Sequence, residues 1–332
     1  MIRRPPRSTH CISSAASDVY KRQVLDRVVE IPNFKPGKVN RIKRERARIA
    51  GGKGVNVSRV VKSLGEDTLC TGWLGGIVGE EIKRRLEEER IPQDFVSIKG
   101  ESRVNWTILS CLDERKQTHL VDVGPQVSTQ EVKSLKEKLV KLVKKSAVVV
   151  FSGSVPPGGG ERIYYSLLNL VHREKENIIS ILDTAGVYLR EGIRAQPFMI
   201  KPNREELEEL KGEKLISQNI LLKEAYSLIR GGISLVVISQ GEREVIVVSK
   251  KRALIFFPPF INPLNTVGAG DALVGGFAVG FKRGMDIVRT SCLGVACGIV
   301  SAEKGRETPF IPSRIIDLSN QIRVKEVTIK DI

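Results

Sequence analysis

The sequence is poor in the residues from which metal and thiol sites are built. Its 332 residues include only three histidines, His10, His119 and His172, and these lie far apart in the chain. The five cysteines form no Cys-x-x-Cys pair. These absences argue against a histidine-built zinc site, a zinc ribbon and a disulfide framework. With no disulfide framework visible, a reducing compartment is the default, so we expect a cytoplasmic protein.

Aromatic residues and long apolar runs are scarce too. No run approaches the roughly 18–20 apolar residues of a membrane helix, so we expect no membrane partner. Lysine and arginine (54) outnumber aspartate and glutamate (38), which gives a net charge of +16 and favours anionic ligands. Aromatics are only 5% and the basic residues are scattered, so a phosphorylated small molecule or a nucleotide is favoured over nucleic acid.

Several phosphate-binding signatures are missing as well. The chain has no GxxxxGK[ST], HRD or DFG motif, which excludes a P-loop enzyme and a protein kinase. Residues 75–79 (GGIVG) lack the full dinucleotide fingerprint.

Short β-branched runs alternate with helix-period segments along most of the chain. The apolar runs predict strands buried on both faces, and the alternation predicts an α/β fold with a mostly parallel sheet. Two polar, strand-like stretches, near residues 38–50 and 103–122, predict a small β-sheet lid over the mouth of a site. The expected strands are 147–151, 178–182, 235–238 and 245–248, and the expected helices are 131–144, 161–173, 204–210 and 221–229.

The first 23 residues differ from the rest. They have no hydrophobic period, and no apolar segment follows the basic start, so they do not form a signal peptide. We interpret residues 1–23 as a disordered or a non-native extension, the latter resembling translated sequencing-adapter read-through. Residues 24–332 then form one domain with its lid.

A glycine-rich motif, NTVGAGD, predicts the reaction chemistry. Gly268, Ala269 and Gly270 precede a helix of small residues, and the unpaired N–H groups of a helix start bind anions. The carboxylate of Asp271 would repel a phosphate, so its useful role is to accept a proton from an attacking hydroxyl. A helix cap is the purely structural alternative.

The order of motifs resembles that of the phosphofructokinase B (ribokinase-like) carbohydrate kinases, in the branch of fructose-1-phosphate and tagatose-6-phosphate kinases. The resemblance covers residues 25–314. It implies a ribokinase-like three-layer αβα sandwich with a β lid, ATP and Mg²⁺ as cofactors, and a homodimer formed through the lid. The motifs are LDR (25–27), KPGKVNR (35–41), GGKGVNVSRV (51–60), RVN (103–105), SGSVPPG (152–158), LDTAG (182–186), KPNREELEEL (201–210) and NTVGAGD (265–271).

The resemblance also implies which residues bind the sugar phosphate. In the family, the glycine-lysine motif binds the acceptor sugar, and the lid arginine contacts the phosphate that the sugar already carries. The apolar strand that precedes LDR in the family is not recognisable here, which predicts a gap in the sheet. The implied sugar-phosphate contacts are Asp26, Gly52, Lys53, Asn56, Arg103 and Asn105.

The nucleotide side is implied in the same way. Asn203 and Glu206 have the spacing of a capping box, and in the family they lie near Mg²⁺ and the phosphates, so both roles stay open. Lys201, Ser239 and Gly241 complete the predicted cofactor site.

The resemblance predicts ATP-dependent phosphorylation of a ketohexose phosphate, with fructose 1-phosphate converted to fructose 1,6-bisphosphate. Tagatose 6-phosphate and fructose 6-phosphate are alternative acceptors. A non-catalytic protein and a nucleic-acid binder are the alternatives from other classes.

Overall fold

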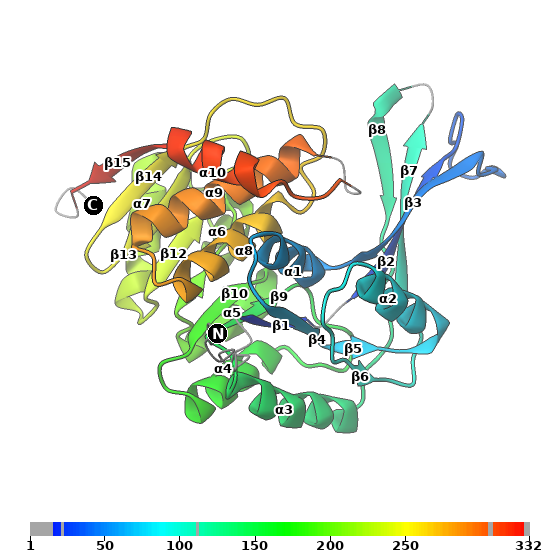
Figure 1. The fold of residues 1–332 in the computed structure, drawn as a ribbon, viewed down its shortest axis with the longest axis horizontal. Helices are drawn as coiled ribbons and strands as arrows, with labels where there is room; N and C mark the ends of the chain where they lie inside the picture. The colour runs from blue at the N-terminus through cyan, green and yellow to red at the C-terminus, as the bar shows by residue number, and fades with distance from the viewer. Residues whose placement is uncertain (1–15, 21–22, 111–112, 305–307, 329–332) are drawn as a thin grey trace, which may run out of the picture.

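In this computed structural model, residues 16–20, 23–110, 113–304 and 308–328 are described. A sheet of nine strands forms the centre of the molecule (Figure 1). The strand order is β15-β14-β13-β12-β11-β10-β9-β1-β4. All pairs from β4 to β12 are parallel, and β13, β14 and β15 add antiparallel strands at the other edge. The strands are β1 (Ala16–Tyr20), β4 (Thr68–Thr71), β9 (Val148–Ser152), β10 (Ile179–Asp183), β11 (Met199–Ile200), β12 (Leu235–Ile238), β13 (Val245–Ser249), β14 (Ala253–Phe257) and β15 (Arg323–Val327).

Helices cover both faces of this sheet (Figure 1), which confirms the three-layer α/β prediction. Successive strand residues alternate between the two apolar cores: Val149 packs with one, and Val148 and Val150 with the other. One core contains α1 (Lys53–Ser63), α8 (Ala269–Lys282), α9 (Ile287–Glu303) and α10 (Pro312–Gln321); the other contains α3 (Thr129–Val143), α4 (Ile163–Glu174), α5 (Gly186–Gly192), α6 (Arg204–Lys211) and α7 (Gln218–Arg230).

A second sheet of four strands projects from one end of the main sheet (Figure 1). Its order is β3 (Arg44–Gly51), β2 (Val24–Glu30), β7 (Arg103–Ser110) and β8 (Asp113–Leu120). Helix α2 (Gly76–Glu88) and the short pair β5 (Trp73–Leu74) and β6 (Val96–Ser97) lie at its base. The lid sheet is larger than the sequence indicates: β2 is an additional strand, whereas residues 38–43 form a loop.

The main sheet is continuous at the position where the sequence predicted a gap. Strand β1 lies between β4 and β9, and it pairs in parallel with both of them. The segment ASDVY lacks the continuous apolar character of its neighbour VVVFS in β9, so the sequence pattern did not identify it as a buried strand. Residues 16–20 belong to the segment interpreted as an extension, and residues 1–15 and 21–22 of that segment lie outside the described residues.

Candidate active site

The carboxyl ends of the parallel strands bring the predicted residues Lys201 and Ser239 to the same edge of the sheet as Asp183. Asp183 ends β10, Lys201 follows β11, and Ser239 follows β12. The N–H of Lys201 donates to the carbonyl of Leu182 at 3.2 Å, which places Lys201 directly beside Asp183. Ligands of doubly wound α/β folds bind at this edge of the sheet, so the topology itself favours a site here.

Asp183 is a fully buried carboxylate that holds two lysines. Its Oδ2 accepts from Lys53 Nζ at 3.1 Å, and its Oδ1 lies 3.2 Å from Lys201 Nζ. Burial acts to raise the pKa of Asp183, but the attraction of Lys201 and Lys53 outweighs it and keeps this pKa below its ordinary value. The carboxylate therefore stays ionised and keeps both ammonium groups at the strand ends.

Asp271 is also buried, in the first turn of α8, but its surroundings shift its pKa in the opposite direction. Burial raises the pKa of Asp271 above its ordinary value, and the neighbouring Asp183 adds to the rise, while Lys53 and Asn56 act against it. Lys53 Nζ lies 3.4 Å from Asp271 Oδ1, and Asn56 Nδ2 donates to Oδ2 at 2.8 Å. A carboxylate with a raised pKa is suited to accept a proton.

The glycine motif lies where α8 begins. Gly268 is the residue before the helix, with φ of 90°, a left-handed conformation that glycine adopts without strain. A Cβ on Gly270 would lie 3.5 Å from Lys201 Nζ, so this glycine borders the lysine pair. The N–H of Ala269 already donates to Thr266 at 3.2 Å, which makes it part of the turn, in contrast to the anion-binding role predicted for it.

The lid contributes polar groups from two adjacent strands. In the register of β2 and β7, Asp26 is paired with Asn105 and Val24 with Arg103. Asn105 Nδ2 donates to Asp26 Oδ1 at 3.4 Å, and Arg103 Nη1 donates to the carbonyl of Asp122 at 3.4 Å. Asp26 thus lies within a lid strand, beside Asn105, and not at the end of a strand in the main sheet.

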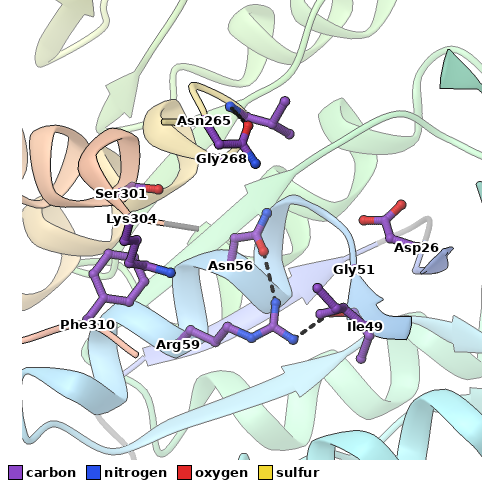
Figure 2. Close-up of a pocket in the computed structure, with 12 residues that line it drawn as sticks. Asp26, Ile49, Gly51, Asn56, Arg59, Asn265, Gly268, Ser301, Lys304 and Phe310 are labelled. Atoms are coloured by element: carbon purple, nitrogen blue, oxygen red, sulfur yellow. Dashed lines mark hydrogen bonds between the residues drawn. The ribbon is translucent and has the colours of Figure 1, made fainter. Parts of the chain in front are cut away.

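A pocket joins the lid to the start of α8 (Figure 2). Asp26 and Gly51 lie at one side of it, Asn56 lies in the middle, and Gly268 lies across from them. A Cβ on Gly51 would clash with the side chain of Asp26, so this glycine leaves room for the Asp26 carboxylate where it lies. The pocket therefore brings together substrate and catalytic residues predicted from three distant parts of the sequence.

Asn203 and Glu206 form the predicted capping box at the start of α6. Asn203 Oδ1 accepts from the N–H of Glu206 at 2.7 Å, and Glu206 Oε2 accepts from the N–H of Asn203 at 2.8 Å. Ser239 is beside them, because the N–H of Arg204 donates to its carbonyl at 3.1 Å. Gly241 follows in a left-handed turn with φ of 65°.

The residues present fit a Mg²⁺ ion carried by nucleotide phosphates better than one held by protein alone. Among the described residues, no three histidine, cysteine, aspartate or glutamate side chains converge on one point. Asp183 is engaged by two lysines, but Glu206 uses only one carboxylate oxygen in its capping box. Mg²⁺ commonly binds one or two carboxylates and completes its shell with water and phosphate.

Two residues inside the quoted motifs have roles that sequence reasoning missed. Asp183 lies in LDTAG, and its signal is an acidic residue directly after an apolar strand. Arg59 lies in GGKGVNVSRV, where its spacing of three from Asn56 places both side chains on one face of a helix. In the structure, Arg59 Nη1 donates to Asn56 Oδ1 at 3.1 Å (Figure 2).

Comparisons with known proteins identify the family to which this chain belongs. The profile of the pfkB family of carbohydrate kinases matches residues 20–314. A 1-phosphofructokinase from Borreliella burgdorferi is 36% identical over 279 residues, which cover 84% of this chain and 88% of that protein. A tagatose-6-phosphate kinase from Staphylococcus epidermidis is 32% identical over 300 residues, which cover 90% and 95%.

A solved structure shows the same fold. Phosphofructokinase-2 from Escherichia coli superimposes with a TM-score of 0.86 at 23% identity, over 93% of this chain and 99% of that one. In the part of the chain that the structure describes, no helix has the length and apolar character to cross a membrane. The match of one family profile over most of the sequence, the two similar curated proteins and the shared fold establish that this chain belongs to the pfkB family of carbohydrate kinases.

Proposed function

We propose that this kinase phosphorylates a ketohexose phosphate with ATP, and that its substrate is fructose 1-phosphate and its product fructose 1,6-bisphosphate. The observation that carries the proposal is the buried carboxylate of Asp271, held at the start of a glycine-lined helix by Asn56 and Lys53. The similarity to a 1-phosphofructokinase supports fructose 1-phosphate as the acceptor. The similarity to a tagatose-6-phosphate kinase keeps tagatose 6-phosphate as the second candidate, ahead of fructose 6-phosphate.

In the proposed reaction, Asp271 acts as the general base. Its carboxylate accepts the proton of the sugar C6 hydroxyl while that oxygen forms a bond to the γ-phosphorus of ATP. The bond between this phosphorus and the bridging oxygen breaks, and ADP leaves with the electron pair. The N–H groups of Gly268 and Gly270, at the positive end of α8, stabilise the charge on the transferred group.

The lysines and the lid arginine supply positive charge for the phosphate groups. Carboxylates surround Lys53: burial alone would lower the pKa of its amine, but Asp183 and Asp271 outweigh burial and raise it, so the amine stays charged. Lys201 lies beside Gly270 and faces the same region. Arg103, at the base of the lid, is the proposed contact for the phosphate already on the sugar.

We propose that Mg²⁺ enters with ATP and that Asn203 and Glu206 contact its water shell. The ion supplies charge neutralisation for the nucleotide phosphates. Glu206 is half-buried; burial raises its pKa, while Lys201 and the N–H of Asn203 act against the rise. Ser239 and Gly241, next to this capping box, form the proposed side of the nucleotide site.

We also propose that two copies pair through the lid. Apolar side chains on its outer parts, including Val39, Ile42 and Leu120, are exposed. A sedimentation measurement on the wild type and on Leu120→Glu tests this pairing: a dimer that dissociates in the variant supports it, and a monomeric wild type contradicts it.

The experiment that tests the reaction measures ADP release with a panel of hexose phosphates. We expect fructose 1-phosphate to have the highest kcat/KM. Asp271→Asn removes the base but keeps the size of the side chain, so kcat should fall by about 10²–10⁴-fold. Glu326→Gln is a matched control, since it also converts a carboxylate to an amide, but in an exposed ion pair with Arg252. Near-normal turnover in Asp271→Asn would contradict the role of Asp271.

A further inference from the structure

A chain of hydrogen bonds leads from Asp271 through Asn56 and Arg59 to Glu89 at the end of α2. Asn56 Nδ2 donates to Asp271 Oδ2 at 2.8 Å, and Asn56 Oδ1 accepts from Arg59 Nη1 at 3.1 Å. Arg59 is in turn held in place: its Nε and Nη2 each donate to Glu89 at 2.6 Å, and Nη2 also donates to the carbonyl of Ala50 at 2.6 Å. Figure 2 shows Arg59 lying along the pocket with Asn56 above it.

The chemistry of arginine fixes the orientation of the amide in the middle of this series of hydrogen bonds. A side-chain amide carries an acceptor oxygen and a donor nitrogen, and either could face a neighbour. A guanidinium can only donate, so it requires the oxygen of Asn56 to face Arg59. The nitrogen must then face Asp271. We infer that Arg59 is a positioning residue for the phosphoryl transfer: it sets the orientation of the Asn56 amide and, through it, the hydrogen bond to the catalytic carboxylate. This inference rests on the proposed role of Asp271 as the base.

Because of the groups around Asp271, the orientation of the Asn56 amide affects how readily Asp271 ionises. The charged groups that face it are Lys53 on α1, Asp183 at the end of β10 and Lys201 after β11. Burial and Asp183 disfavour ionisation of Asp271, and the Asn56 hydrogen bond favours it together with Lys53 and Lys201. If the amide turned over, its oxygen would face the carboxylate, and the base would lose a donor and gain a repulsive neighbour.

A purely structural role for Arg59 makes a different prediction. Arg59 connects α1 to Glu89 at the end of α2 and to Ala50 in β3, so its loss lowers stability in either case. Only a positioning role moves the pH dependence of kcat. Glu89→Gln is therefore the matched control, because it weakens the anchoring of Arg59 but leaves the donor to Asn56 in place.

The test compares pH profiles of kcat for Arg59→Met and Arg59→Gln with those of the wild type and Glu89→Gln. Both Arg59 variants allow the amide to turn, so the acid limb should move upward by about one pH unit or more, and kcat on that limb should fall about tenfold. Glu89→Gln should unfold at lower urea but keep the wild-type acid limb. An unmoved acid limb in a folded Arg59 variant overturns the inference. Arg59→Gln, the milder change, decides it if Arg59→Met does not fold.

A double-mutant cycle shows whether Arg59 acts through Asn56. In an Asn56→Ala background there is no amide to orient, so adding Arg59→Gln should leave the acid limb where Asn56→Ala alone puts it. Independent, additive shifts would contradict the inference.

Asp271→Asn separates this result from the proposed function. If that variant keeps its activity, Asp271 is not the base. If it loses activity and the Arg59 variants show no shift of the acid limb, only the positioning role of Arg59 is wrong.

Discussion

At the scale of single residues, two buried aspartates receive opposite roles from their neighbours. Asp183 touches two ammonium groups, and these hold its pKa below the ordinary value. Asp271 touches one lysine and one amide, and burial raises its pKa. The first is therefore an ionised anchor for Lys53 and Lys201, and the second is suited to take up a proton. Neighbouring groups, and not the residue type, decide which carboxylate is suited to accept a proton.

Replacing the anchor should cost much of the stability of the protein. In Asp183→Asn the ammonium of Lys201, which is only 4% exposed, loses its carboxylate partner. Breaking a buried ion pair from one side costs about 3–5 kcal/mol, and urea unfolding at pH 7 should show a loss of this size.

Glu326→Gln provides the comparison for this loss, because its partner Arg252 lies on the surface and water replaces the carboxylate. Its unfolding midpoint should stay at the wild-type value. Equal midpoints for Asp183→Asn and Glu326→Gln would show that the strand-end lysines do not depend on Asp183.

At the scale of elements, glycines control how closely α8 approaches its neighbours. A Cβ on Gly276 would lie 2.6 Å from the Cα of Gly294 in α9, and one on Gly275 would lie 2.8 Å from Cβ of Val60 in α1. Both contacts involve atoms close to the backbone, which cannot rotate away. The small-residue pattern of α8 therefore sets the distance between three helices, and this distance fixes where the start of α8 meets Asn56.

Gly276→Ala should therefore destabilise the protein, although alanine is the better helix former. The added methyl group forces α8 and α9 apart, and overpacking of this kind costs about 1–3 kcal/mol. Thermal and urea unfolding measure the loss. Gly298→Ala, elsewhere in α9, meets its nearest atom at 3.2 Å and should change stability by less than about 1 kcal/mol in either direction. A stabilised Gly276→Ala variant would contradict the close packing of α8 on α9.

At the scale of the whole molecule, strand β1 completes the parallel part of the sheet. It fills the position between β4 and β9, with Val19 paired to Thr71 on one side and to Phe151 on the other. Without it, two strands of the main sheet would present unpaired edges in the middle of the fold. The edge strand β15 is placed differently: it adds to β14 alone, and its residues are mostly exposed.

A proline in β1 tests whether this segment holds the sheet together. Val19→Pro removes a backbone donor from a central strand, where proline is not tolerated. We expect little soluble folded protein, or a urea midpoint far below that of the wild type. Ile216→Pro is the control, since Ile216 is 78% exposed in the loop before α7, and it should fold normally. Wild-type stability of Val19→Pro would mean that residues 16–20 do not occupy the central position.

The local pattern of the sequence was sufficient for most of the architecture. The runs at 147–151, 178–182 and 235–238 are parallel strands within one residue of the expected bounds. Continuous β-branched runs of this length are typical of strands whose two faces are both covered by helices. The lid was predicted less completely. Residues 24–30 mix apolar and charged residues, and they form a strand only because β3 and β7 pair with them on either side.

The sequence by itself determined the family, the α/β fold and the chemical types available at the site, because motifs and hydrophobic periods are local properties. Only the tertiary structure decided how these groups act on one another. It placed Asp183 between two lysines that lie 130 residues before it and 18 after it. It also engaged the Ala269 N–H in a hydrogen bond within the turn and brought Arg59 within hydrogen-bond distance of Asn56. Electrostatic and hydrogen-bond partners are set by distances in space, and those exist only after the chain has folded.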